Sequence, residues 1–403
     1  MSRIGATLQA GSLSVLLFLL PFSKAVVEVT SVLLLLGWLL QRCDPATRWD
    51  TVWARPSLRR IALALGAFVA VCAASIAVSD HPSHSVRGFF SKWLEYLWMF
   101  VIAADLGARP STVRRGALIM AWSSVFVVVE GVTQEIFGAG IFRGFKRVVY
   151  ARMTGPYENP IDLGTYLMVA ILFLLTYAMI QRGWRRGLLW MVLVPLTICL
   201  GRTLALGVWL AALAAVVMAL LPVPAMRRSL GLFLGLTILS GGVFLHTTGH
   251  TKEILTLSDV GTADRVAMWT AATRMIQDRP LLGHGLNTFM ANYLAYWVGG
   301  ERQPRYAHNC YLQMAAETGL VGLAAFLWLL WLLVSRIHAS LGPPLSEEGL
   351  LLLGLFAGLV AFLLQAGIDT NFYSLRQAAL FWVLAGLALG LSTRLERSAS
   401  TTR

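Results

Sequence analysis

One histidine in the sequence has a context that suits acid–base chemistry. His308 lies in the segment Tyr306-Ala-His-Asn-Cys-Tyr-Leu-Gln, shortly before an apolar stretch that begins near Gly319. The ordinary pKa of an imidazole is near 6.5, so a histidine at a membrane edge can serve as a general base. An interfacial histidine that bonds a backbone carbonyl is an equally good interpretation of its position alone. We therefore treat His308 as a candidate base, with Asn309 beside it as a supporting residue.

Two isolated arginines could hold an anion, because a guanidinium group donates paired hydrogen bonds to phosphate oxygens. Arg202 follows Gly201 in a very short turn between two apolar stretches, and Arg265 lies at the start of a helical pattern. Each has a second interpretation. Arg202 can extend to lipid headgroups, and Arg265 can form a surface ion pair with Asp264 or Asp259.

A basic loop at residues 137–160 adds more cations of the same kind. It carries four basic residues against one acid, Glu158; the basic residues are Arg143, Lys146, Arg147 and Arg152. Cations held outside the cytoplasmic loops of a membrane protein indicate an anionic ligand, although long loops also cross the membrane regardless of charge. Together with His308, these arginines predict several phosphate-binding groups and one base.

Metal and nucleotide sites have no support in the residue spacing. His81 and His84 are three apart, and His246 and His250 are four apart, but neither pair has the further ligands that a metal needs. The sequence has no P-loop and no His-Glu-x-x-His segment. We interpret these histidines as solvated loop residues and expect no metal.

The composition indicates which elements must hold these side chains. Hydrophobic residues make up 57% of the 403, and charged residues make up only 13%, whereas about 25% is usual in soluble domains. This excludes a soluble globular enzyme, a disordered protein and a disulfide-stapled secreted domain. Apolar blocks long enough to cross a bilayer predict an all-α polytopic membrane protein with about twelve transmembrane helices. They lie near residues 4–21, 24–41, 58–79, 86–105, 112–136, 161–180, 186–201, 203–221, 229–246, 319–336, 348–368 and 374–392.

Loop charge predicts the orientation and explains the net charge of +13 without nucleic acid. With the N-terminus in the cytoplasm, 18 of the 33 basic residues fall in short cytoplasmic segments, and twelve spans return the C-terminus there. Two loops then lie outside: the basic loop 137–160, and a large loop 247–318 between the ninth and tenth spans. We treat residues 1–403 as a single transmembrane domain.

The large loop 247–318 has helical patterns of its own. A helix is expected to begin at Thr262, with Thr262 or Asp264 as its cap, and to end at Pro280. Its apolar face is expected to contain Val266, Trp269, Thr273 and Ile276. Two further amphipathic segments, 287–297 and 304–317, complete the loop, and the last one runs into the tenth span.

Several segments together carry a family resemblance. They are Arg152-Met-Thr-Gly-Pro-Tyr-Glu-Asn-Pro, Gly201-Arg202, Asp264-Arg265, Pro280-Leu-Leu-Gly-His-Gly-Leu-Asn-Thr-Phe, and His308-Asn-Cys-Tyr-Leu-Gln with Glu317-Thr-Gly. In this combination the chain resembles the O-antigen ligase and polymerase superfamily over about residues 140–320. The His-Asn-x-x-Leu-Gln segment is the most specific part of the resemblance.

The resemblance implies a GT-C-like, inverting glycosyltransferase of the bacterial inner membrane with a periplasmic active site in the loop 247–318. An O-antigen ligase would transfer O-antigen from undecaprenyl diphosphate to lipid A-core, among membrane lipids and without nucleic acid. It implies His308 as the base. Asp369 lies in the last external turn, Ile368-Asp-Thr-Asn-Phe, and is expected to orient His308 or to bind the acceptor. The diphosphate would be held by Arg202 and Arg265, with Arg152, Arg147 and Arg143. Neither a metal nor a nucleotide is implied, and we expect a monomer.

Three other functions stay open. An O-antigen polymerase shares the same motifs. Transfer of glycans to protein is less favoured, because such members carry a longer C-terminal part than the eleven residues after the last expected span. A transporter of lipid-linked glycans would show repeats and midplane polar sites, but no two halves look alike, and the candidate midplane acids are Glu28, Glu95 and Glu130.

Overall fold

The computed structural model describes residues 2–45, 47, 51–148, 152–221, 223–248, 260–299, 303, 305–342 and 345–401. Every regular element in this part of the chain is a helix. The extended pairing found there consists of two isolated bridges, Ala139 with Lys146 and Val148 with Arg152. The predicted all-α class is therefore confirmed.

Eight helical segments among the described residues are long and apolar enough to cross a membrane. Their helices are α2 (Lys24–Arg42), α3 (Arg59–Ala77), α6 (Pro110–Phe137), α7 (Pro160–Ile180), α8 (Gly183–Arg202), α14 (Cys310–Ala339), α15 (Glu347–Ala366) and α16 (Leu375–Thr401). The chain is thus a polytopic helical membrane protein.

Helices also cover the other four expected spans, although they fall outside that group of eight. Two are shorter apolar helices: α1 (Ser2–Leu19), and α9 (Leu206–Ala215) with its π-helical continuation Val216–Leu220. The span expected at 86–105 consists of α4 (Pro82–Gly88), a π-helical turn (Phe89–Trp93) and α5 (Leu94–Gly107). The ninth expected span is α10 (Arg227–Thr248).

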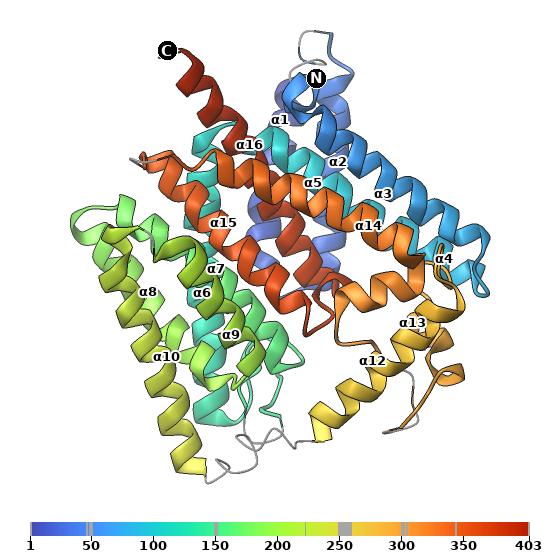
Figure 1. The fold of residues 1–403 in the computed structure, drawn as a ribbon. Coiled ribbons are helices and arrows are strands. Elements are labelled where there is room, and N and C mark those ends of the chain that lie inside the picture. Colours follow the sequence, from blue (N-terminus) through green and yellow to red (C-terminus); the bar gives the residue numbers. More distant parts are fainter. Residues whose placement is uncertain are drawn as a thin grey trace.

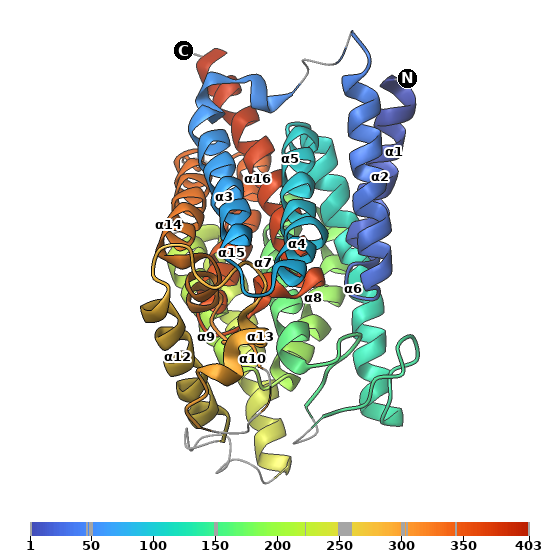
Figure 2. The ribbon, with the colours of Figure 1, turned by 90° about the vertical axis from the view of Figure 1, so that its right-hand side faces the viewer.

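The helices run up and down between two faces of the molecule. Both chain ends lie at the same end of the bundle, at the top of Figures 1 and 2. We call this end the termini face. The opposite end carries the helices of the large loop, α12 (Val260–Asp278) and α13 (Phe289–Asn292), and we call it the loop face.

The centre of the bundle is formed by α7, α15 and α16, which are buried on nearly all sides, as expected of helices that are apolar all round. α16 packs closely along α5, and α15 along α7. Gly386 and Gly390, four residues apart, permit this contact: a Cβ at Gly390 would lie 2.2 Å from the carbonyl oxygen of Ala104. Small residues with this spacing are typical of close membrane-helix pairs.

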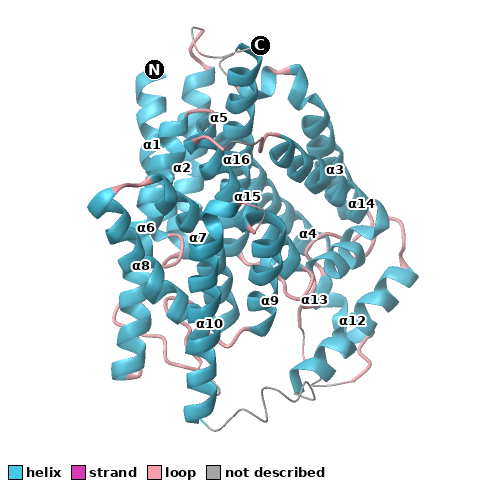
Figure 3. Ribbon diagram, turned by 60° about the vertical axis from the view of Figure 1, so that its left-hand side comes forward, coloured by secondary structure: helices cyan, strands magenta, loops and turns pink. Residues whose placement is uncertain are grey.

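The large loop forms a small core of its own beside the start of α14 (Figure 3). α12 ends at Asp278, just before Pro280 as predicted, but of the predicted apolar face only Ile276 packs against this core. Val266 and Thr273 are exposed, and the buried face consists of Met268, Ala271, Ala272 and Met275. That face packs against Phe289, Tyr293, Ala307 and Ala316.

The predicted cap of α12 was also wrong. The helix already begins at Val260, so Thr262 and Asp264 lie inside its first turns rather than at its N-cap position. Asp264 instead pairs with Arg305, with 2.9 Å between its carboxylate and the guanidinium group. This ion pair ties α12 to the chain segment that leads to His308.

Candidate functional site

His308 lies directly before α14 and is held there by two features of the chain. Its backbone has a φ of +47°, an uncommon left-handed conformation for a residue other than glycine. The next residue, Asn309, is the N-cap of α14, and its side-chain oxygen accepts hydrogen bonds of 3.0 Å from the backbone nitrogens of Tyr311 and Leu312. Asn309 therefore supports the site through the helix start that it caps.

The imidazole of His308 is bonded to Asp369, which lies in the turn between α15 and α16. Nδ1 of His308 is 3.0 Å from Oδ1 of Asp369. A carboxylate accepts but does not donate, so Nδ1 carries the hydrogen, and in the neutral ring Nε2 is the nitrogen with the free lone pair. The His308 side chain is 36% exposed and that of Asp369 only 10%. The pair thus presents a basic nitrogen from a supported ring.

Asp369 is fixed by several further bonds. Its Oδ2 accepts a hydrogen bond from Gln365 at 3.3 Å, and its Oδ1 also accepts one from the backbone nitrogen of Thr370 at 2.8 Å. Its carbonyl oxygen accepts the backbone N–H of Cys310 at 3.1 Å. The turn after α15 and the start of α14 are therefore joined by both side-chain and backbone contacts.

Three of the five predicted arginines lie together where α6 and α8 end. Arg202 binds Glu135 through two nitrogens, with Nε 3.2 Å from Oε1 and Nη2 2.5 Å from Oε2. Arg147 reaches the same carboxylate at 3.3 Å, and Nε of Arg152 donates to the carbonyl oxygen of Thr203 at 2.8 Å. We call Arg147, Arg152 and Arg202 the arginine cluster. Glu135 was not predicted as a site residue. Its position could have indicated this role, because it is an acidic residue at the end of an apolar span that precedes a basic loop.

The other two predicted arginines do not bind Glu135. The exposed Arg143 places its guanidinium 5.2 Å from the ring centre of Phe145. Arg265 makes no hydrogen bond or ion pair with any residue that the structure describes, since Asp264 pairs with Arg305; Asp259 lies outside the described residues. The alternative interpretation of Arg265, a surface ion pair with Asp264, is therefore not found in the structure.

Two polar residues of α6 shape the described parts of the basic loop. The buried carboxylate of Glu130 accepts the backbone N–H groups of Phe142 at 2.7 Å and Arg143 at 2.9 Å. One turn later, Oε1 of Gln134 accepts the backbone N–H groups of Thr154 at 2.9 Å and Gly155 at 3.1 Å. Glu130, which the sequence offered as a midplane acid of a transporter, therefore holds a loop in place.

The segment 152–157 links the arginine cluster to the turn that carries Asp369. At one end, the backbone nitrogen of Met153 donates to the carbonyl oxygen of Arg202 at 3.2 Å. At the other end, the buried Arg376 donates to the carbonyl oxygen of Pro156 at 3.1 Å, and its guanidinium lies 4.2 Å from the ring centre of Tyr157. Arg376 was not predicted, although it is an arginine at the start of an apolar span.

A glycine allows a second contact between these two parts of the site. Gly207 opens α9 shortly after Arg202, and a Cβ there would lie 2.4 Å from Cδ1 of Ile368. Ile368 is the neighbour of Asp369 in the chain. The chain shortly after Arg202 therefore contacts the turn that carries Asp369.

Two of the motif segments interlock through their backbones. The nitrogen of His284 donates to the carbonyl oxygen of Ala316 at 3.0 Å, and the nitrogen of Gly285 donates to that of Glu317 at 2.8 Å. Gly319 has a φ of +70°, and a Cβ there would lie 2.0 Å from the carbonyl oxygen of Leu281. The Pro-Leu-Leu-Gly-His-Gly turn thus packs against the break in α14.

The carboxylate of Glu317 completes this junction. It accepts the backbone N–H groups of Asn287 at 2.8 Å and Phe289 at 3.2 Å, and the side-chain amide of Gln313 at 3.1 Å. On the other side of the turn, Oδ1 of Asn287 accepts a hydrogen bond from Lys92 at 2.8 Å. Lys92 lies in the π-helical turn before α5, a feature frequent at functional sites. Sequence reasoning did not single it out.

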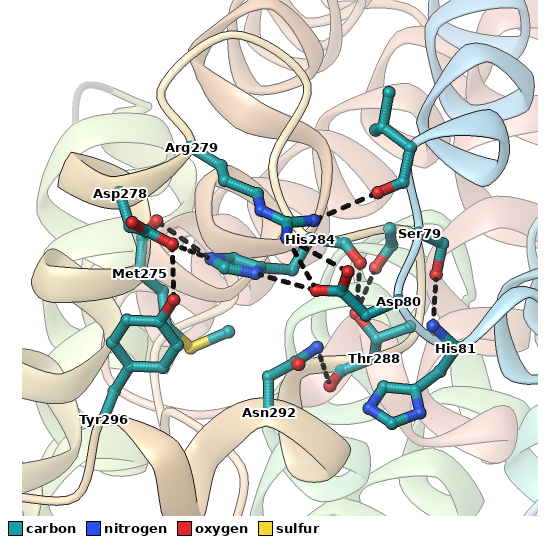
Figure 4. Close-up of polar contacts among 12 residues, drawn as sticks. Ser79, Asp80, His81, Met275, Asp278, Arg279, His284, Thr288, Asn292 and Tyr296 are labelled. Atoms are coloured by element: carbon teal, nitrogen blue, oxygen red, sulfur yellow. Dashed lines mark hydrogen bonds and ion pairs between the residues drawn. The ribbon is translucent and has the colours of Figure 1, made fainter.

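A buried histidine lies at the outer end of the same turn (Figure 4). The ring of His284 lies between two carboxylates, each 3.8 Å away: Asp80 before α4 and Asp278 at the end of α12. Its Nε2 is 3.2 Å from the carbonyl oxygen of Met275. Burial lowers the pKa of His284 from its ordinary value, more than the nearby acids raise it.

The histidine pairs considered as metal ligands gain no further ligands in the structure. The rings of His81 and His84 lie 5.7 Å apart, while His250 falls outside the described residues. Within the ranges given above, no three side chains of His, Cys, Asp or Glu gather as they would around a metal ion.

The family comparison covers the segments that hold most of these groups. Residues 191–327 match the family described as O-antigen ligase, and this range includes Arg202, Arg265 and His308. No curated protein matches the chain. Residues 191–327 are therefore similar to the O-antigen ligase family.

Proposed function

We propose that the protein is an O-antigen ligase, which transfers O-antigen from undecaprenyl diphosphate to lipid A-core. The observation that carries the proposal is the His308–Asp369 pair, which lies on the same face of a membrane protein as the arginine cluster. A transfer of this kind needs a base for the acceptor hydroxyl and positive charge for the leaving diphosphate. The superfamily match supports the same class of reaction.

The chemistry follows from the free nitrogen of His308. Nε2 accepts the proton of an acceptor sugar hydroxyl while the hydroxyl oxygen attacks the anomeric carbon of the donor. The bond from that carbon to the diphosphate oxygen breaks, and its electron pair leaves with undecaprenyl diphosphate. A single displacement of this kind inverts the anomeric centre. Asp369 keeps the ring oriented and stabilises the imidazolium that forms.

The arginines neutralise the charge that develops on the leaving group. Arg202 and Arg265 bind the diphosphate, and Arg152, Arg147 and Arg143 extend the positive surface around it. Arg202 already holds a two-oxygen partner in Glu135, and a phosphate group accepts the same paired bonds. The donor diphosphate therefore replaces Glu135 as the partner of Arg202.

The two faces of the bundle indicate on which side of the membrane the reaction takes place. We assign the loop face to the periplasm and the termini face to the cytoplasm of the bacterial inner membrane, because the short basic loops gather at the termini face. Since guanidinium groups supply the positive charge, the transfer needs neither a metal ion nor a nucleotide. The proposed catalytic unit is a monomer, since one chain supplies every residue named.

The decisive test is transfer by the purified full-length protein from undecaprenyl-diphosphate-linked O-antigen to lipid A-core, with EDTA present and no nucleotide. We expect glycosylated lipid A-core with inverted anomeric configuration, and a loss of about 10²–10⁴-fold in the His308→Ala variant. Longer lipid-linked glycans in place of glycosylated lipid A-core would identify a polymerase. A strict need for Mg²⁺ or Mn²⁺ would contradict the assigned role of the arginines.

A further inference from the structure

A second cationic site lies on the termini face, at the opposite end of the bundle from His308. It is a pocket of about 240 Å³ beside α1, at the ends of α2, α5 and α16. Five arginines from four segments of the chain line it, and we call it the arginine pocket. They are Arg42, Arg55, Arg109, Arg394 and Arg397.

One carboxylate lines the arginine pocket, and its hydrogen-bonding capacity is already used. Oδ1 of Asp105 accepts hydrogen bonds from the hydroxyl of Thr51 at 2.6 Å and the backbone nitrogen of Val52 at 2.9 Å. Oδ2 accepts them from Arg42 at 2.6 Å and the indole of Trp38 at 2.8 Å. A carboxylate offers about four lone-pair sites, so Asp105 balances Arg42 and has no site left for the other arginines.

Two of the remaining arginines have no anionic partner in the described structure. The side chains of Arg109 and Arg394 are exposed and make no hydrogen bond or ion pair with any described residue. Like charges around one small cavity repel one another, and an anion between them turns this repulsion into attraction.

The surroundings of Arg109 favour an anion in another way. A second cavity of about 210 Å³ shares Arg109 with the arginine pocket and adds Arg115. Arg109 is the N-cap residue of α6, and its side chain does not cap the helix. The first turn of this 28-residue helix, where the helix dipole has its positive end, therefore lines the second cavity.

We propose that the arginine pocket binds the phosphate group of an anionic phospholipid. Guanidinium groups donate paired bonds to phosphate oxygens, and 240 Å³ is far more than the 10–15 Å³ that one water needs. The pocket lies where the membrane-spanning helices α2, α6 and α16 begin or end, which is the level of the lipid headgroups. Basic pockets between membrane helices at this level are typical binding sites for anionic headgroups.

Native mass spectrometry of the full-length protein in detergent tests the proposal, with phosphatidylglycerol, cardiolipin, phosphatidylcholine and inorganic phosphate as separate probes. The variant is Arg109→Gln with Arg394→Gln. The matched control is Arg59→Gln with Arg60→Gln, which removes the same charge from exposed residues at the start of α3 that line neither cavity.

We expect the wild type to retain the anionic lipids and not phosphatidylcholine. The pocket variant should bind them about thirtyfold more weakly, because each arginine near an anionic surface contributes about 1 kcal/mol and two are lost. The control should bind as the wild type does. Equal weakening in both variants, or none in the pocket variant, would overturn the proposal. If the protein retains inorganic phosphate but none of the lipids, the bound phosphate group does not come from a phospholipid, and the proposal is overturned. Because the arginine pocket lies away from the loop face, neither outcome of this experiment bears on the proposed glycosyl transfer.

Discussion

Oδ1 of Asp369 lies 3.0 Å from Nδ1 of His308, although 61 residues separate the two in the chain. The contact exists because α14 begins where α15 ends, and the backbone of Cys310 bonds to the carbonyl oxygen of Asp369. A base that is oriented by a carboxylate is a recurring arrangement in transfer enzymes. It gives the proposed reaction a residue pair whose two members can be tested separately and together.

Replacement of Asp369 by Asn should lower kcat by about 10²–10⁴-fold while the protein still inserts, because the amide can stabilise the wrong tautomer of His308. The measurement is transfer rate at equal membrane abundance. Because the two residues act as a unit, His308→Ala combined with Asp369→Asn should cost little more than His308→Ala alone. Glu347→Gln, an exposed carboxylate at the start of α15, serves as the control. Fully additive losses would contradict the paired role.

Lys at position 202 should be a poor substitute for Arg, with turnover lower by about 10²–10³-fold, because an ammonium group cannot give the paired bonds that Arg202 now gives to Glu135. Glu135→Gln separates donor binding from structure. If Arg202 serves the donor, this variant keeps its turnover and its KM for the donor does not rise. If Arg202 serves only to hold Glu135, both variants lose activity and abundance together.

Arg265 permits a cleaner version of the same experiment, because it has no ion pair with a described residue whose loss would confuse the result. Arg265→Lys should leave the melting temperature unchanged and lower turnover by about 10²–10³-fold. Arg274→Lys, an exposed position further along α12, is the matched control and should behave as the wild type. Wild-type turnover in Arg265→Lys would remove Arg265 from the donor site.

A methyl group at Gly319 should loosen the large loop from the bundle. The residue has a φ of +70°, and a Cβ would lie 2.0 Å from the carbonyl oxygen of Leu281. Gly319→Ala should lower the free energy of unfolding by more than about 1–3 kcal/mol, the usual cost of such a conformation alone. Gly66→Ala in α3 meets open space and should be neutral or slightly stabilising. Thermal unfolding measures the stability of both variants. Limited proteolysis between α12 and α14 should be faster than in the wild type only for Gly319→Ala.

Low pH should destabilise the packing of the large loop against the bundle, because His284 becomes protonated. Burial lowers the pKa of His284 from about 6.5, so the folded protein binds this proton less readily than the unfolded chain does. Its contribution to stability is therefore complete above pH 6.5 and decreases as the pH falls below that value. Melting temperatures between pH 5 and 8 should fall on the acid side in the wild type. The fall should be smaller in His284→Gln, and an identical slope would show that other groups cause it.

The sequence by itself determined the class of the protein and the position of its candidate base. Long apolar blocks have few alternatives to membrane-spanning helices, because a backbone in lipid must satisfy its own hydrogen bonds. The caps and breaks are local as well: Asn309 starts α14, and Pro280 follows the end of α12. These features depend on neighbours within a few residues, so they can be predicted from the order of residues alone.

Only the tertiary structure decided which side chains meet. Glu135 became the partner of Arg202 because the ends of α6 and α8 lie side by side, a contact across 67 residues. The buried face of α12 was missed because Met268 and Met275 found an apolar partner surface in α13 and α14, whereas periodicity alone favoured the face of Val266. Helix packing chooses among several faces of similar apolar character, and the choice depends on the shape of the surface opposite, which no single segment contains.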